Sequence, residues 1–192
     1  MYDFIEGAVS YDVVKRPEDF YESAVAFGRF QYLLSDYPAE TLHETIPDFH
    51  NTVKRYRDLE AAIAADVAGR RKCVEPEIAF VRERKAELGE LLDLQRAGKL
   101  PLRVTHNDTK LNNIMMDEKT GRGICVIDLD TEMPGLSLYD FGDSIRYGAN
   151  TGAEDEVDLT RVSLDLSLYR LYKKGYLEGS QGSLSALEQK ML

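Results

Sequence analysis

Residues 100–135, LPLRVTHNDTKLNNIMMDEKTGRGICVIDLDTEMPG, decide the fold of this chain. Three short apolar runs, LRVTH, NIMMD and GICVIDLD, alternate with polar turns, which is typical of short strands. The turn DEKTGRG between the last two runs carries two glycines and predicts a hairpin. Carboxylates and amides gather where these runs end, so the same stretch holds the candidate functional residues.

The segments on both sides of this stretch have the residue spacing of helices. Pro17 lies near the first turn of the earliest helix, whose apolar face falls on Phe20, Ala24, Phe27, Phe30 and Leu34. Four further helices are predicted at residues 52–69, 76–97, 136–149 and 157–177. Gly98 ends the helix at 76–97, and a polar loop at residues 150–156 precedes the helix at 157–177. A Gly/Ser break then precedes a last short helical piece within residues 178–192. The sequence therefore predicts an α+β fold, mostly helical, in which a small β-hairpin carries the catalytic and metal loops.

The overall composition excludes several classes of protein. At 192 residues the chain suits one domain or one large lobe, and its net charge of −10 argues against a nucleic-acid partner. No apolar run approaches the roughly 18 residues of a membrane span, and the first residues lack the pattern of a secretory signal. We therefore expect no membrane partner and a cytoplasmic location. The two cysteines have no spacing typical of a disulfide framework or a metal site.

The order of the polar residues predicts a site for phosphoryl transfer. Asn113 follows Asp108 by five residues, and Asp128 ends the second strand of the hairpin, so strand pairing would bring them to one rim. Carboxylate and amide oxygens are ligands that Mg²⁺ prefers, and Mg²⁺ usually shares them with phosphates. Asp108 is then the carboxylate that can accept the proton of a hydroxyl and direct its oxygen toward a phosphorus.

Two motifs in this stretch carry a resemblance to a known family. HNDTKLNN, residues 106–113, resembles the catalytic loop of the kinase-like phosphotransferases, and VIDLD, residues 126–130, resembles the metal-binding element of the aminoglycoside phosphotransferase and choline kinase group. With IDLDTEMPGLSLYDFGDSIR, residues 127–146, the motifs are most similar to the N-acetylhexosamine 1-kinase branch. The resemblance implies a protein-kinase-like C-terminal lobe that uses Mg²⁺ and ATP to phosphorylate a hydroxyl of a small molecule, such as a sugar or amino sugar.

The resemblance also implies a role for each residue of the loop. Asp108 is the expected catalytic base, Asn113 a magnesium ligand, and Asp128 the main magnesium ligand that bridges the nucleotide phosphates. His106 is expected to organise the loop through hydrogen bonds. Lys110 can neutralise charge on the transferred phosphoryl group, although many aminoglycoside phosphotransferases have histidine at that position.

A further pair of carboxylates has a less direct expected role. Asp140, Phe141 and Gly142 spell the protein-kinase magnesium signature, but they fall inside a predicted helix, 32 residues after Asp108. We therefore expect Asp140 to lie behind the catalytic loop and support it. Asp130 stays between two interpretations, a second metal or substrate contact and a surface residue.

Several aromatic and polar residues have simpler interpretations. Phe49 and His50 could line a sugar pocket, but a loop in which Asn51 or Thr52 caps the next helix is favoured. The tyrosines of the helix at residues 157–177 are expected to pack in the core rather than to line a substrate groove: Tyr169, Tyr172 and Tyr176.

The resemblance sets expectations about the surroundings of this lobe as well. No glycine-rich loop or strand lysine precedes the motifs, so we expect residues 1–192 to form the C-terminal lobe without the N-terminal nucleotide-clamping lobe. The expected consequences are weak or absent kinase activity in isolation and an exposed lobe-docking surface that can drive dimerisation. Two alternatives stay open, a non-catalytic interaction module and a metal-dependent hydrolase. The lack of a His-rich two-metal cluster in the sequence disfavours the hydrolase.

Overall fold

In the computed structural model the chain divides into two units. Unit 1 comprises Met1–Thr45 and Leu102–Leu192, and unit 2 comprises Ile46–Pro101. The structure describes residues 3–152 and 156–192. Unit 1 contains all of the candidate residues from the catalytic and metal loops.

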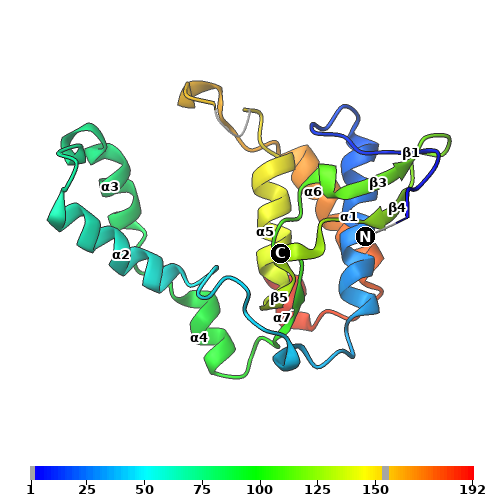
Figure 1. Cartoon of the computed structure of the whole chain (residues 1–192), viewed down its shortest axis with the longest axis horizontal. Helices are drawn as coiled ribbons and strands as arrows, with labels where there is room; N and C mark the ends of the chain where they lie inside the picture. Colours follow the sequence, from blue (N-terminus) through cyan, green and yellow to red (C-terminus); the bar gives the residue numbers. More distant parts are fainter. Residues whose placement is uncertain (1–2, 153–155) are drawn as a thin grey trace. The chain divides into compact units, whose positions relative to one another are not determined.

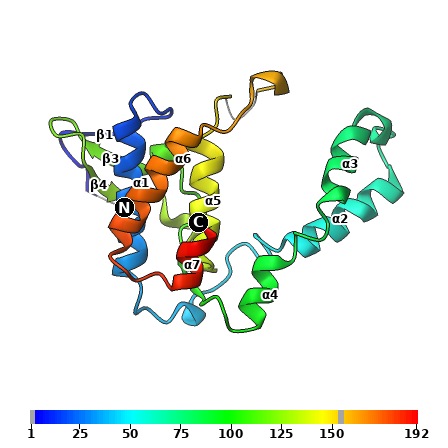
Figure 2. The ribbon, with the colours of Figure 1, turned by 180° about the vertical axis from the view of Figure 1, so that it is seen from behind.

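Two long helices lie side by side at the centre of unit 1 (Figure 1 and Figure 2): α1 (Pro17–Leu33) and α6 (Leu166–Ser180). Their backbones come so close that a Cβ atom at Gly28, Gly175 or Gly179 would collide with the facing helix. Only glycine lacks a Cβ, so these positions set the distance between the two helices.

The apolar core of unit 1 lies between these helices and α5 (Ser137–Gly148). The ring of Phe141 lies 5.6 Å from that of Tyr172 and 5.5 Å from that of Tyr176, measured between centroids. Phe20 of α1 lies 4.5 Å from Tyr172. The predicted packing of Tyr172 and Tyr176 in the core is confirmed, as is burial of most of the predicted face of α1, at Phe20, Ala24 and Phe27.

Unit 1 also contains two small antiparallel sheets. The first has the order β1 (Ala8–Val9), β3 (Ile114–Asp117), β4 (Gly123–Val126). The second pairs β2 (Arg103–Thr105) with β5 (Met133–Gly135). The predicted hairpin between β3 and β4 is confirmed, with a register shift between Met115 and Met116 that leaves Ile124 of β4 without a partner in the pairing. The mostly helical composition with small antiparallel sheets confirms the α+β class.

The C-terminal helix α7 (Ala186–Met191) is fixed to unit 1 by buried polar contacts. A capping box at Ser185 starts the helix, and the carboxylate of Glu188 forms an ion pair with Arg103 at 2.6 Å. The same carboxylate accepts a hydrogen bond of 2.7 Å from Ser137 Oγ. Short 3₁₀ turns complete unit 1: η1 (Ala39–Thr41), η3 (Leu111–Asn113), η4 (Leu129–Thr131) and η5 (Leu159–Arg161).

Unit 2 is helical, and the prediction of one of its helices is wrong. Its elements are α2 (Thr52–Ala65), η2 (Arg71–Cys73), α3 (Glu75–Glu83) and α4 (Glu90–Arg96). The predicted helix at 76–97 is therefore two helices, joined by turns in which backbone N–H groups donate three residues back, as from Arg84 to Val81 and from Glu87 to Arg84. Thr52 Oγ1 donates a hydrogen bond of 2.5 Å to the carbonyl of Leu88 in this connection. The favoured cap is confirmed, since Asn51 Oδ1 accepts a bond of 2.9 Å from the Lys54 N–H. The predicted stop is also confirmed, because α4 ends before Gly98, which has a φ of 67°.

The helix predicted at 157–177 begins later than expected. Its first half is replaced by a backbone pairing, in which the N–H of Thr151 donates to the carbonyl of Ser163 at 3.0 Å and the N–H of Asp165 donates to Ala149 at 2.8 Å. Asp165 then caps α6. Part of the predicted polar loop, residues 153–155, lies outside the described residues. Among the described residues, no helix has the length and apolar character needed to cross a membrane.

Candidate functional site

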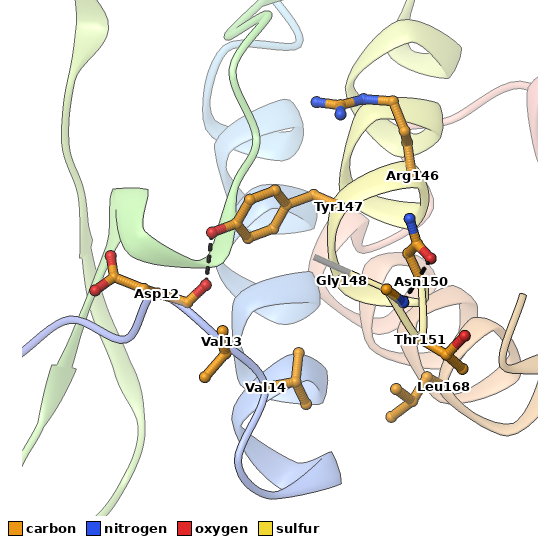
Figure 3. A pocket seen from close by; sticks show the side chains of 10 residues that line it. Asp12, Val13, Val14, Arg146, Tyr147, Gly148, Asn150, Thr151 and Leu168 are labelled. Atoms are coloured by element: carbon orange, nitrogen blue, oxygen red, sulfur yellow. Dashed lines mark hydrogen bonds between the residues drawn. The ribbon is translucent and has the colours of Figure 1, made fainter. Parts of the chain in front are cut away.

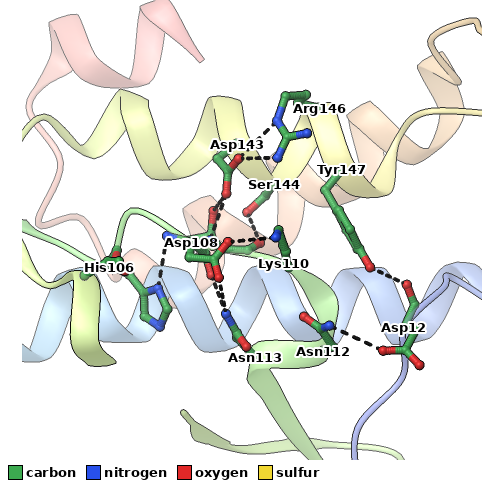
Figure 4. Close-up of polar contacts among 12 residues, drawn as sticks. Asp12, His106, Asp108, Lys110, Asn112, Asn113, Asp143, Ser144, Arg146 and Tyr147 are labelled. Carbon is green, nitrogen blue, oxygen red and sulfur yellow. Dashed lines mark hydrogen bonds and ion pairs between the residues drawn. The ribbon is translucent and has the colours of Figure 1, made fainter. Parts of the chain in front are cut away.

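The loop at residues 106–113 connects β2 to β3 and lies against α5 (Figure 4). The hairpin places Asn113, just before β3, beside the residues that follow β4, because Ile114 pairs with Val126 and the N–H of Ile127 donates to the carbonyl of Asn113 at 2.9 Å. Asp128 is the next residue along the chain. The loop and the hairpin end therefore meet at one rim, as the strand pattern predicted.

His106 connects the two halves of this rim. Its Nδ1 accepts a hydrogen bond of 3.3 Å from the N–H of Asp108, and its Nε2 lies 2.9 Å from the carbonyl of Ile127. Because Nδ1 is the acceptor, Nε2 must carry the proton and donate to that carbonyl. The ring is fully buried and makes edge contacts with Phe27 and Phe30 of α1.

The side chains of Asp108, Lys110 and Asn113 converge on the outer side of the loop (Figure 4). Asn113 Nδ2 donates to the carbonyl of Asp108 at 2.8 Å and to its Oδ2 at 3.1 Å. The ammonium group of Lys110 lies 3.3 Å from Asp108 Oδ1. The amide of Asn113 is thereby oriented with its nitrogen on Asp108, which leaves Oδ1 available to another ligand.

Asp128 and Asp130 lie at the exposed end of the hairpin. Asp128 has a left-handed backbone with a φ of 61°, which Asp tolerates better than most residues. Within residues 3–152 and 156–192, neither carboxylate takes part in a hydrogen bond or an ion pair. Asp130 belongs to the 3₁₀ turn after Asp128 and is also exposed.

Asp140 lies on the opposite, buried side of the loop, inside α5. Its Oδ1 accepts a hydrogen bond of 2.8 Å from the N–H of Asn107, and its Oδ2 accepts bonds from the N–H of His106 at 3.0 Å and from Gln31 Nε2 at 3.1 Å. Burial raises the pKa of the Asp140 carboxyl to about 6, and the hydrogen bonds from the two backbone N–H groups oppose that rise. The Asp140 carboxylate therefore fixes the start of the loop to α5, which carries it, and to α1, which carries Gln31.

Sequence reasoning missed three residues that hold the loop from behind. Asp143 Oδ2 accepts from the N–H of Thr109 at 2.9 Å, and Ser144 Oγ donates to the carbonyl of Thr109 at 2.9 Å. Gln31 donates to Asp140 and also to the carbonyl of Val104 at 3.0 Å. Asp143 follows Asp140 by one helical turn, which was a usable signal. Gln31 is a polar residue one turn after Phe27 on the buried face of α1, which was a weaker one.

The donor set at the rim fits a magnesium ion that also binds phosphates. Asn113 Oδ1 and the Asp128 carboxylate are hard oxygen ligands, and Mg²⁺ commonly takes one or two such protein ligands with phosphate and water oxygens. No three His, Cys, Asp or Glu side chains of the described chain gather closely enough to form a metal site alone. The rim therefore suits a cation that arrives with a polyanionic ligand better than a resident structural metal.

Residues 1–173 match the family model described as the Phosphotransferase enzyme family. The matched region includes the loop at 106–113, the hairpin, α5 and the first half of α6.

Proposed function

Because the chain belongs to the Phosphotransferase enzyme family, we propose that it transfers the γ-phosphoryl group of ATP to a hydroxyl of a small molecule. Membership makes the chain an enzyme by family and implies a small-molecule substrate. The observation that carries the finer proposal is the orientation of Asn113, whose amide nitrogen is bound to Asp108 while its oxygen points away. An amide held in this way presents a ligand oxygen next to a carboxylate.

Each residue of the rim has a proposed part in the reaction. Asn113 Oδ1 and Asp128 would hold Mg²⁺, which when bound offsets the charge of the nucleotide phosphates. Asp108 accepts the proton of the acceptor hydroxyl, and its hydrogen bond from Asn113 keeps one carboxylate oxygen in place. Lys110, 3.3 Å from that carboxylate, is close enough to share its charge with the transferred phosphoryl group. His106 keeps the loop and the hairpin end together and takes no part in proton transfer.

The architecture and the acceptor belong to the same proposal. The helices, the hairpin and the loop of this chain are consistent with the C-terminal lobe of a kinase-like phosphotransferase. The similarity of residues 127–146 to the N-acetylhexosamine 1-kinase branch makes an N-acetylhexosamine the proposed acceptor. Asp130 is two residues from the proposed metal ligand Asp128, where a second metal or substrate contact would be made.

Thermal unfolding with and without Mg²⁺ and ATP tests the proposal. Ligand at about 100 times its dissociation constant adds roughly 2.7 kcal/mol of stability, which corresponds to an upward shift of about 5 to 10 °C for a chain of this size. The shift should require Mg²⁺ and should disappear in Asp128→Asn. Glu118→Gln, an exposed acid of the same hairpin, is the matched control and should keep it. A shift that persists without Mg²⁺, or that Asp128→Asn leaves unchanged, would contradict the proposed metal site.

A further inference from the structure

Two hydrogen bonds with α5 hold the backbone of Thr109, the residue between Asp108 and Lys110. The N–H of Thr109 donates to Asp143 Oδ2 at 2.9 Å, and its carbonyl accepts a bond of 2.9 Å from Ser144 Oγ (Figure 4). The N–H belongs to the peptide group that follows Asp108, and the carbonyl belongs to the peptide group that precedes Lys110. The helix therefore fixes both peptide groups between the proposed base and the lysine.

The hydroxyl group of Ser144 has a second possible acceptor within its own helix. A serine inside a helix commonly donates to the carbonyl four residues earlier, which here belongs to Asp140. That carbonyl accepts a bond of 2.6 Å from Thr109 Oγ1, while Ser144 Oγ donates to the Thr109 carbonyl. The loop and the helix thus exchange hydroxyl bonds, and the hold on the loop depends on the direction of the Ser144 proton.

Tyr172 of α6 determines that direction. Its hydroxyl donates a hydrogen bond of 2.5 Å to Ser144 Oγ. Burial raises the pKa of Tyr172, so the phenol keeps its proton and stays a donor. Because Ser144 Oγ accepts from Tyr172, the serine proton is directed to another acceptor, the carbonyl of Thr109. The bonds form a chain with one polarity, from α6 through α5 to the loop.

Solvent does not reach this chain of hydrogen bonds. The exposed fraction is 0% for Tyr172 and 1% for Ser144. A cavity of about 520 Å³ opens at the C-terminal end of α5, where Arg146, Tyr147 and Gly148 line it (Figure 3). Its described lining includes neither Ser144 nor Tyr172. Loss of the Tyr172 hydroxyl would therefore leave Ser144 without a replacement donor.

The chain ends beside the proposed reacting groups. The ammonium group of Lys110 lies 3.3 Å from Asp108 Oδ1. Rotation of the peptide group between Thr109 and Lys110 would move these two side chains relative to each other. Phosphoryl transfer depends mainly on positioning and charge stabilisation, and a misplacement of about 1 Å can cost roughly 100-fold in rate.

We propose that Tyr172 is a positioning residue for the phosphoryl transfer, which acts through Ser144 to hold Lys110 at Asp108. The expected effect on rate rests on the proposed function, whereas the effect on the position of Lys110 is independent of the reaction. The inference gives α6 a part in placing the loop, in addition to α5. Tyr172→Phe keeps the packed ring and removes only the hydroxyl.

Tyr176 offers a matched control on the same helix. It is also fully buried, and its hydroxyl donates a bond of 3.3 Å to the carbonyl of Ser137 in the first turn of α5. Tyr172→Phe and Tyr176→Phe each remove one buried hydroxyl, so a general loss of stability should appear in both variants. Only Tyr172→Phe interrupts the chain that leads to Thr109.

NMR of protein labelled with [¹³Cε]lysine tests the position of Lys110 without any substrate. The Lys110 signal, assigned with Lys110→Arg, should shift in Tyr172→Phe and in the same direction in Ser144→Ala. Tyr176→Phe should leave the signal in place. An unchanged signal in folded Tyr172→Phe, or equal shifts in the two tyrosine variants, would overturn the proposal. If Tyr172→Phe does not unfold cooperatively, the signal in Ser144→Ala decides in the same way.

Formation of ADP with N-acetylglucosamine as the acceptor measures the effect on the reaction. Tyr172→Phe should lower kcat about ten-fold and leave the KM for ATP within about two-fold, because the chain places reacting groups and does not bind the nucleotide. Adding Tyr172→Phe to Ser144→Ala should cost no further rate, since the two residues act in series. An equal loss of kcat in Tyr176→Phe, or a higher KM with unchanged kcat, would overturn the positioning role.

The thermal shift with Mg²⁺ and ATP keeps the two proposals distinguishable. Tyr172→Phe should retain that shift, because the proposed metal ligands Asn113 and Asp128 are not part of the chain. If the wild type shows neither the shift nor ADP formation, the proposed function is wrong, and the NMR comparison still decides whether Tyr172 places Lys110. If the wild type shows both and the two tyrosine variants behave alike, the proposed function stands and the positioning role is wrong.

Discussion

The loop at residues 106–113 has a buried side and a solvent-exposed open side, and each side carries a carboxylate next to a side-chain amide. On the buried side, both oxygens of Asp140 accept hydrogen bonds from Gln31 and the loop backbone. On the open side, Asp128 accepts none from the described part of the chain, and Asn113 uses only its nitrogen. The comparison teaches that a carboxylate with both oxygens hydrogen-bonded within the fold holds the structure, whereas one whose oxygens accept no such bond is available to a ligand. Substitutions on the two sides should therefore change different properties.

The largest expected effect is on the open side. Asp108→Asn should lower the rate of phosphoryl transfer about 1,000-fold, because an amide cannot accept the proton of the acceptor hydroxyl. The free energy of unfolding should change by less than about 0.5 kcal/mol, since Asn can still accept the hydrogen bond from Asn113. Formation of ADP with the acceptor sugar, measured beside urea unfolding, checks both expectations. A variant with unchanged turnover would remove Asp108 from the role of base.

The next largest effect is on the buried side. Asp140→Ala should lower the free energy of unfolding at pH 7 by about 2 to 4 kcal/mol, because three hydrogen-bond donors lose their acceptor in the core. Urea unfolding gives the value. Asp130→Ala, on the exposed turn, is the control and should stay within about 0.5 kcal/mol of the wild type. Equal losses in the two variants would break the distinction between the sides.

A smaller, pH-dependent effect sharpens the comparison. The pKa of Asp140 is about 6 in the folded state, whereas an Asp in the unfolded chain has a pKa near 3.9. Protonation therefore stabilises the fold fully below about pH 4, and that contribution is lost as the pH rises through 6. Relative to Asp140→Asn, the wild type should gain about 2 kcal/mol of unfolding free energy between pH 7 and pH 4. A difference that is constant with pH, or that changes in the other direction, would show that burial does not raise this pKa.

Local patterns predicted the elements that depend on neighbouring residues. The hairpin followed from two short apolar runs and a glycine-containing turn, and α1 from Pro17 and the spacing of its apolar residues. The errors occurred inside segments whose residue spacing is helical throughout. Turns with three-residue backbone hydrogen bonds interrupt the segment at 76–97, and backbone pairing of Thr151 with Ser163 replaces the first half of the segment at 157–177.

The candidate site divides in the same way. The spacing within residues 106–128 was enough to predict that the loop holding Asp108 and Asn113 lies beside the hairpin end that precedes Asp128, because the hairpin is a local structure. The contact between Gln31 and Asp140 joins residues 109 positions apart. Such contacts depend on how the helices pack, which no pattern in one segment reveals.

The close contact between α1 and α6 has a consequence for how this fold can vary. Side chains at the loop can be exchanged to suit another acceptor, but the smallest possible addition, a single methyl group, has no space at Gly28, Gly175 or Gly179. In a library of random variants selected only for folding, these three glycines should therefore persist while the chemistry of the loop drifts. The signature of the scaffold would then be three positions at which no side chain is tolerated.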